Sequence, residues 1–423
     1  MPKPCSSHEH LSRRSLLKGS LATVGGGTVM NWGGLFNSDA FASEAKKNNK
    51  RCILIWLNGG CSQFETFDMK VGRSTGGPFR EISTNVAGTR VCELMPQISQ
   101  RMDKLTVIRS MRTTEIDHPQ GIYSMHTGWS KSADTRFPEI GAIVAKYCGS
   151  AESDLPNFVK ISSQGNAGSG ILGPQYQPFN LGRDGDLPTF SKSRLTPELE
   201  SRRHSLRDFV ESTYAENHLA EPVRMHREAY DRARRLNNVL SAFELEEEWE
   251  KYRDKYGNSN IGRRMMIAAR LVEAGVAFVE VGQSGYDTHA DNFEGHKSLI
   301  PPMEHGWAAM LDDLEDRGLL DDTLVVWMGE IGRTPRINNR SGRDHYVRSW
   351  STALAGGGVK GGLVYGESDE DGVDVISDKV TEADFFATIY TALGIDPTTE
   401  NYSGVRPIPL AQFEHRVVKE ILI

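Results

Sequence analysis

Residues 286–296 read YDTHADNFEGH, residues 323–335 read TLVVWMGEIGRTP, and residues 341–346 read SGRDHY. These stretches concentrate acidic and histidine side chains, which bind divalent metals through oxygen and nitrogen. Two apolar runs, residues 276–281 and 323–328, have the length and composition of buried strands. In an open α/β sheet, ligands collect at the carboxyl ends of the strands. We therefore expect a sheet whose strand ends direct these side chains toward one site.

Candidate metal ligands follow these strand ends. Asp287 and His289 lie two residues apart, so on an extended segment both side chains point to the same side. Glu330 offers a hard oxygen ligand after the next strand. Asp344 and His345 are adjacent in a later loop, where they can serve two metals, or one metal and the residues that orient its ligands. Taken singly, each has a plainer explanation as a cap, a turn or a surface residue, but their recurrence at successive strand ends predicts a metal site.

Four other positions carry candidate site chemistry. Arg333 and Arg343 stand beside the acidic residues, and an always-charged, bidentate guanidinium suits an oxyanion such as phosphate or sulfate. Asn58 follows the apolar run of residues 52–57. His118 lies at a loop-to-helix junction, where a helix N-terminus stabilises an attacked anion. The structural alternative for each is a turn or a surface side chain.

Strand and helix patterns alternate along the chain, which predicts a mostly parallel sheet with helices on both faces. Strands are expected at residues 52–57, 105–111, 158–161, 276–281, 323–328, 351–354 and 363–365, and helices at 94–102, 121–126, 138–148, 261–273, 296–316 and 382–393. The segment 165–196 is rich in Gly, Pro and Asn and is expected to be loop.

The first 42 residues predict an export signal. Residues 12–18 read SRRSLLK, which matches the twin-arginine pattern, a Gly-rich apolar run follows, and residues 40–42 read AFA, a small-x-small cleavage site. An ordinary amphipathic helix is the alternative. Residues 43–423 are then expected to form a single domain with a densely charged helical insertion at about residues 197–256. The expected location is the periplasm or the cell envelope.

The net charge and the spacing of the cysteines argue against some kinds of partner and metal site. The 423-residue chain has a net charge of −7, and its first 42 residues carry four basic and two acidic side chains, so the remainder carries −9. This acidic balance argues against nucleic acid as the main partner. No apolar run long enough to span a bilayer remains after the signal. The four remaining cysteines lack CxxC or Cys/His finger spacing, which argues against a thiolate zinc site.

Several motifs together resemble a known family. They are LNGGCSQFETFDMK (57–70), MHTG (125–128), LVEAGVAFVEVGQSGYDTH (271–289), GEIGRTPRIN (329–338) and GRDHY (342–346). The combination resembles the exported family called "domain of unknown function 1501" over nearly the whole chain. That family looks like a branch of the alkaline phosphatase/sulfatase superfamily. The resemblance implies a three-layer α/β/α sandwich with a metal site at the strand ends.

The resemblance also implies roles for single residues. Asp287 and His289 resemble the superfamily's Asp-x-x-x-His metal pair, with shorter spacing. His345 resembles the last metal histidine of the superfamily. Glu330 stands where the superfamily has the Asp of its Asp-His-Gly motif, and Ile331 replaces the histidine of that motif.

Other positions depart from the superfamily pattern. Asp344 is the candidate replacement for the lost histidine ligand, and Asn58 stands where the first metal Asp usually lies, which leaves a second ion open. Aligning Thr127-Gly128 with the Thr-Gly that follows the sulfatase Cys-x-Pro-Ser-Arg motif places His118 at the nucleophile position. That motif is absent from the sequence, so a formylglycine sulfatase is not expected. His118 is then a candidate nucleophile, metal ligand or general acid, and the sequence leaves the three open.

The expected function is an exported, metal-dependent hydrolase of phosphate or sulfate esters. Zinc, with manganese or calcium as alternatives, would polarise the ester oxygen and activate a nucleophile, and Arg333 or Arg343 would hold the anionic group. The substrate would be an anionic ester, for example a sulfated or phosphorylated glycan. The alternative is a non-catalytic binding protein of the cell envelope that keeps the fold, which Asn58 and Ile331 motivate.

Overall fold

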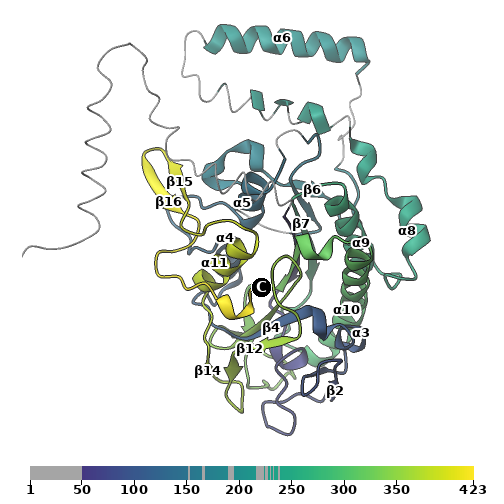
Figure 1. Ribbon diagram of the computed structural model, residues 1–423, viewed down its shortest axis with the longest axis vertical. Helices are drawn as coiled ribbons and strands as arrows, with labels where there is room; N and C mark the ends of the chain where they lie inside the picture. Colours follow the sequence, from purple (N-terminus) through teal and green to yellow (C-terminus); the bar gives the residue numbers. More distant parts are fainter. Residues whose placement is uncertain are drawn as a thin grey trace, which may run out of the picture. The chain divides into compact units, whose positions relative to one another are not determined.

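A β-sheet lies at the centre of the computed structural model (Figure 1). It has eight strands in the order β12-β4-β11-β8-β1-β7-β5-β6. Its strand β1 (Arg51–Asn58) is an apolar run between two parallel neighbours, β7 (Phe278–Ser284) and β8 (Thr323–Met328). Nearly every residue of β1 is buried, because helices cover both faces of the sheet. A near-continuous apolar sequence is typical of such a strand.

The structure describes residues 50–423 apart from 151–152, 164–166, 189–194, 216–222, 224–226, 229, 232 and 237–238. The expected export signal, residues 1–42, lies outside the described residues, as does part of the expected insertion at 197–256. Described within that insertion are α6 (Pro197–Ala215), a 3-10 helix (Leu240–Phe243) and α8 (Glu246–Tyr252). The described residues all belong to one compact unit. Within the described part of the chain, no helix combines the length and apolarity needed to cross a membrane.

The remaining strands extend the sheet on both sides. On one side, β5 (Phe158–Ile161) pairs in parallel with β7 and with β6 (Phe179–Leu181). On the other side, β11 (Trp350–Ala355) runs antiparallel to both β8 and β4 (Leu105–Met111), and β12 (Leu363–Tyr365) runs parallel to β4. The expectation of a mostly parallel sheet is therefore confirmed, with β11 reversed.

Strand β6 corrects one sequence prediction. It lies inside residues 165–196, which were expected to be loop, and it pairs with β5 at the end of the sheet order. A three-residue strand is too short to show the alternation that identifies strands in sequence. The 3-10 helices Gly170–Leu172 and Pro174–Tyr176 lie in the same segment.

Helices pack on both faces of the sheet. One face carries α3 (Pro96–Ser99), α9 (Asn260–Glu273) and α10 (Asn292–Asp316), and the other carries α4 (His118–Thr127), α5 (Ile140–Tyr147) and α11 (Glu382–Ala392). Successive side chains of β1 divide between the two cores, as the alternation of a strand requires. Ile53 and Ile55 join the core under α9 and α10, whereas Leu54 and Trp56 join the core under α4, α5 and α11. The three-layer α/β/α sandwich expected from the sequence is confirmed.

Short strand pairs lie outside the central sheet. They are β2 (Glu81–Ser83) with β3 (Arg90–Cys92), β9 (Gly332–Arg333) with β10 (His345–Tyr346), β13 (Glu367–Ser368) with β14 (Val375–Ser377), and β15 (Glu400–Ser403) with β16 (Arg406–Pro409). Further 3-10 helices span Gln63–Glu65, Met102–Lys104, Leu320–Asp322 and Lys419–Ile421.

The carboxyl group of Glu304 on α10 is expected to make the free energy of unfolding depend on pH. Its carboxylate accepts hydrogen bonds from the backbone N–H groups of Gln97 and Ile98, each at 2.9 Å, and burial raises the pKa of Glu304 from 4.5 to about 7. A raised pKa in the folded state contributes stability below pH 4.5, and this contribution is lost as the pH rises through 7. Relative to Glu304→Gln, wild type should therefore lose stability between pH 5 and pH 8. Urea unfolding of both proteins in the presence of a chelator checks this, and parallel pH profiles would contradict it.

Candidate metal centre

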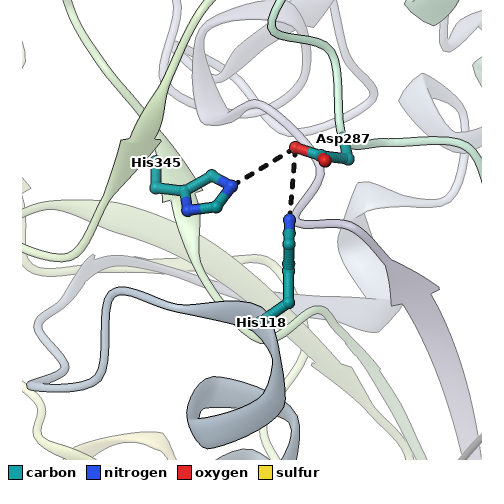
Figure 2. A group of neighbouring side chains, drawn as sticks. All are labelled: His118, Asp287 and His345. Carbon is teal, nitrogen blue, oxygen red and sulfur yellow. Dashed lines mark hydrogen bonds and ion pairs between the residues drawn. The ribbon is translucent and has the colours of Figure 1, made fainter.

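Three histidine rings surround one carboxylate oxygen, Oδ1 of Asp287. The Nε2 atoms of His118, His289 and His345 lie 3.2, 3.1 and 3.3 Å from it, and those of His289 and His345 are 3.1 Å apart. Figure 2 shows the rings of His118 and His345 turned toward Asp287. The ligand atoms of His118, Asp287 and His345 all lie within 4.8 Å of one another.

Each of these side chains comes from the end or the start of a structural element. Asp287 and His289 follow β7, and His118 is the first residue of α4. Pro119 stands in the first turn of α4, where its fixed φ and missing N–H fit a helix start. His345 begins β10, which pairs with β9. The elements thus bring residues far apart in sequence to one point near the carboxyl end of β7, as the position of the motifs predicted.

The second nitrogen of two rings is held by a carboxylate. Nδ1 of His118 lies 2.8 Å from Oε1 of Glu330, and Nδ1 of His289 lies 2.7 Å from Oδ1 of Asp344. An ionised carboxylate only accepts hydrogen bonds, so these Nδ1 atoms carry protons. In the neutral form of either ring, the Nε2 lone pair would then face Asp287. A lone pair facing a carboxylate oxygen is repelled unless a cation or a proton lies between them. Metal-binding histidines commonly have this carboxylate partner.

The ligand atoms of His118, Asp287 and His345 lie close enough together to share one divalent ion. With metal–ligand distances of about 2.0–2.1 Å, neighbouring ligand atoms of a tetrahedral zinc site lie about 3.3 Å apart. The separations of 3.1–3.3 Å between Asp287 Oδ1 and each of the three Nε2 atoms are close to this value. Two buried oxygens, Asn58 Oδ1 and Glu330 Oε2, also have no hydrogen-bond partner among the described residues. The residues therefore fit a divalent metal that favours nitrogen and oxygen ligands.

Glu330 connects β8 with β1 and α4. Its side chain is fully buried, and Oε1 accepts hydrogen bonds from Gly59 N at 2.8 Å and from His118 Nδ1. Gly121 of α4 packs closely on Glu330, since a Cβ at position 121 would lie 3.4 Å from the Cβ of Glu330. The structure thus places Glu330 on the far side of the His118 ring from Asp287, where it fixes the orientation of that ring.

Arg333 lies fully buried behind Asp287. Its Nη2 is 2.8 Å from Oδ1 of Asp287, and its guanidinium also donates to the backbone carbonyls of Gly59 and, at 3.0 Å, Gly60. Gln63 holds the Arg333 backbone through both amide atoms, accepting from its N–H at 2.9 Å and donating to its carbonyl at 2.8 Å. Arg333 is thereby fixed against Asp287 with no exposed surface.

The charges around the site keep Asp287 ionised. Burial would raise the pKa of Asp287, but the hydrogen bond and charge of Arg333, aided by His118, lower it well below its usual range. The hydrogen bond to Glu330 raises the pKa of His118. Burial, together with the positive charges of His118 and Arg333, lowers the pKa of His345 and favours its neutral ring, which is the form that binds metal.

Arg343 and His296 face the protein interior. The guanidinium of Arg343 is fully buried and all five of its N–H groups are engaged, two by Oε1 of Glu65 at 3.0 and 3.2 Å and three by the carbonyls of Thr75, Thr334 and Pro335. His296 accepts from Ser62 N at 3.0 Å through Nε2, and its Nδ1 lies 2.8 Å from the carbonyl oxygen of Asn292. The structure therefore gives both residues structural partners.

Gln63 and Glu65 support the site but were not assigned a role from the sequence. Both are buried in the 3-10 helix that follows β1, where they hold Arg333 and Arg343. The available signal was the presence of polar side chains on both sides of Phe64, shortly after a buried strand. Their partners lie about 270 residues further along the chain, and pattern reasoning cannot pair positions at that separation.

Gly59→Ala is expected to lower metal affinity about 100-fold. Gly59 has a φ of +107°, and a Cβ there would lie 2.4 Å from the backbone nitrogen of Asp287, which must shift. Misplacing a group in an active site by about 1 Å can lower the reaction rate about 100-fold, and we expect a loss of the same size in metal affinity. Zinc titration calorimetry measures the effect. Gly275→Ala is the matched control, because Gly275 has a φ of +100° and a Cβ at that position would meet no atom within 4 Å. Equal zinc affinity in both variants would contradict the prediction.

Comparison with known proteins places the chain in a family. The family model described as "Protein of unknown function (DUF1501)" matches residues 49–422, so the chain belongs to that family. Comparison with curated proteins found no match.

Solved structures with some likeness to this chain include a sulfatase, a lipoteichoic acid synthase and a periplasmic domain. The PsFucS1 sulfatase from Pseudoalteromonas sp. is 12% identical, with 84% of this chain and 71% of that chain covered and a TM-score of 0.39. The lipoteichoic acid synthase LtaP from Listeria monocytogenes is 10% identical, with coverages of 89% and 78% and a TM-score of 0.37. The C-terminal periplasmic domain of EcEptC from Escherichia coli, in complex with Zn, is 9% identical, with coverages of 85% and 92% and a TM-score of 0.39. Likeness at this level says nothing about activity, which depends on the site itself.

Proposed function

We propose that this DUF1501 chain is an exported, divalent-metal-dependent hydrolase of phosphate or sulfate esters. The observation that carries the proposal is the approach of three imidazole Nε2 atoms to Asp287 Oδ1, with His118, Asp287 and His345 close enough to share one ion. Zinc is the favoured ion because imidazole and carboxylate ligands at this spacing suit it, with manganese and calcium as alternatives. When bound, the ion would polarise an ester oxygen and activate the attacking group. Export is inferred from the first 42 residues, which combine the twin-arginine pattern at 12–18, an apolar run and the small-x-small site at 40–42.

The side chains divide into groups that would hold the ion and groups that would hold those ligands in place. The proposed ligands are Asp287, His118, His289 and His345. Glu330 and Asp344 would orient two of the rings through their Nδ1 protons. In this arrangement His118 is a ligand and not the attacking group, because its Nε2 lone pair faces the same point as Asp287.

The two predicted arginines receive different roles in this proposal. Arg333 would keep Asp287 ionised and in position, since its guanidinium is buried between Asp287 and backbone carbonyls. Arg343 would stabilise the loop beneath the site through its pairing with Glu65. Neither guanidinium has surface exposed for an anionic substrate, so the substrate's charge must be met by the ion and by cations elsewhere.

The test is hydrolysis of p-nitrophenyl phosphate and p-nitrophenyl sulfate by the purified protein. We expect stoichiometric metal by elemental analysis, and turnover that a chelator abolishes and that zinc, manganese or calcium restores. Hydrolysis that is insensitive to chelation, or a protein that takes up none of these ions, would overturn the proposal. Stoichiometric metal with no turnover of any ester would favour the alternative, a binding protein of the cell envelope.

A further inference from the structure

A cleft of about 620 Å³ with a mixed polar and apolar lining opens at the carboxyl ends of β5, β6 and β7. This volume lies within the range of about 300–1,000 Å³ that small-molecule sites usually occupy. Its polar lining includes Ser162, Arg183, Asn260, Arg264, Ser284 and Ser298. Hydroxyl, amide and guanidinium groups of this kind donate and accept hydrogen bonds with a polar, anionic ligand.

The cleft and the candidate metal centre lie at the carboxyl ends of the neighbouring strands β7 and β1. Ser284 on its wall is the Cα partner of Asn58 in the pairing of β7 with β1, and adjacent strands lie about 4.8 Å apart. Asp287 follows Ser284 by three residues, a span of at most about 11 Å of extended chain. One ligand of the size of a sugar unit with its substituents can therefore reach from the metal centre into the cleft.

Arg264 is a buried cation on the wall of the cleft. It is 6% exposed, its Nε donates to the carbonyl of Arg183 at 2.6 Å, and its Nη1 donates to the carbonyl of Gly282 at 2.9 Å. No described residue accepts a hydrogen bond from its Nη2. Arg183 lines the same cleft, and Asp184 is the acidic group that acts on Arg264, so the three side chains carry a net charge of +1. An anion entering the cleft would find a positioned guanidinium with a free donor.

The backbone around the cleft is also arranged for a ligand. Ser162 has a φ of +53°, a left-handed conformation that costs free energy for a residue with a side chain and that often marks a functional site. Its carbonyl is packed on Gly282, where a Cβ would lie 2.3 Å from it. Helix α9 begins at the cleft, and its cap Ser259 accepts from Gly262 N at 3.1 Å. The first N–H groups of the helix add positive potential there.

We propose that this cleft binds the non-reacting part of the substrate, a sugar unit that carries a second anionic group. The inference rests on the proposed ester hydrolysis and adds a substrate class to it. Arg264 and Arg183 would hold the second sulfate or phosphate, because guanidinium groups pair with such oxyanions through two hydrogen bonds. The serine hydroxyls and Asn260 would bind the sugar hydroxyl groups. A cation is needed here because Arg333 and Arg343 are both engaged inside the protein.

The test compares binding of galactose 4,6-disulfate with binding of galactose 6-sulfate by calorimetry on the full chain, with and without metal. Wild type is expected to bind the disulfate at least tenfold more tightly. Arg264→Gln is expected to remove this preference, and Arg183→Gln to reduce it about threefold. Arg263→Gln is the matched control, because Arg263 is the next residue on α9, carries the same charge, and pairs with Glu246 away from the cleft.

A second variant covers the case in which Arg264→Gln fails to fold. Ser298 is an exposed residue of α10 on the cleft wall, so Ser298→Trp is expected to fill the cleft without disturbing the core and to abolish the preference for the disulfate. The inference is overturned if the folded variants keep the wild-type preference, or if Arg263→Gln loses it equally. Failure of the proposed function is distinguishable, because it shows as absent metal-dependent hydrolysis of the p-nitrophenyl esters while the preference for the disulfate persists.

Discussion

Asp287→Asn is expected to lower kcat/KM for metal-dependent ester hydrolysis about 1,000-fold and to weaken zinc binding by at least 100-fold. Asp287 Oδ1 is the atom that the three facing rings share, so its charge is central to the proposed ligand set. A Lewis-acid metal contributes several kcal/mol to the barrier, and each 1.36 kcal/mol corresponds to a tenfold change in rate. The amide keeps a hydrogen-bond acceptor for Arg333, so the buried guanidinium does not lose its partner and the fold should survive.

Asp344→Asn provides the graded control. Asp344 touches the proposed site only through Nδ1 of His289, at 2.7 Å, and loss of such an outer partner costs about 10–100-fold in metal affinity or activity. The expected order is therefore wild type, then Asp344→Asn, then Asp287→Asn, with unchanged circular dichroism in all three. Zinc titration and p-nitrophenyl phosphate kinetics on the same samples measure it. If Asp287→Asn retained wild-type zinc affinity, Asp287 could not be a ligand.

The fold was largely predictable from the sequence because its strands are local patterns. Apolar runs such as residues 52–57 and 323–328 needed no partner to be recognised, and the structure has β1 and β8 there. The order of the strands was not predictable, because β1 pairs with β7 and β8, which lie more than 200 residues further along. Strand β6 was missed because a strand of three residues is too short to show an alternating pattern of side chains.

The candidate site was predictable in position but not in the direction of its side chains. The sequence singled out Asp287 after a strand, His345 in a later loop and His118 at a loop-to-helix junction, and the structure brings the three together, although their roles remain predictions. The inward orientation of Arg343 could not be foreseen, because it depends on pairing with Glu65, 278 residues away in the chain. In the sequence, an arginine beside acidic residues suggests a contact with substrate, because the sequence does not show its buried partner.

A buried charge network includes two charged residues that interrupt apolar strands. The sequence analysis gave these residues no role. Lys160 interrupts the apolar strand β5 and Glu280 interrupts β7, and the two are Cα partners in the parallel pairing of these strands. Nζ of Lys160 lies 3.4 Å from Oε2 of Glu280 and 2.6 Å from Oε2 of Glu139, and all three side chains are almost fully buried. His126 of α4 adds a contact to Oε1 of Glu280 at 3.0 Å. The network thus joins the sheet to α4 and to the start of α5.

Lys160→Met is expected to destabilise the protein by about 3–5 kcal/mol, because it leaves two buried carboxylates without their shared cation. Burial would raise the pKa of Glu280, but Lys160 and His126 lower it to about 2. A lowered pKa contributes stability at neutral pH that is lost only as the pH falls toward 2. Without Lys160 the pKa of Glu280 rises, so acid unfolding should begin at a higher pH than in wild type. Urea unfolding at pH 7 and an acid titration followed by circular dichroism measure both effects.

Lys104→Met is the control for the loss of a lysine charge. Lys104 pairs with Glu315 at the surface, where such a pair contributes at most about 1 kcal/mol because water solvates and screens both charges. Adding Glu280→Gln to Lys160→Met should recover part of the lost stability, since it removes one of the two stranded charges, while Glu139 keeps hydrogen bonds from the N–H groups of Ala167 and Gly168. If Lys160→Met cost no more than Lys104→Met, water must reach the network, and Lys160 would not be the cation that stabilises it.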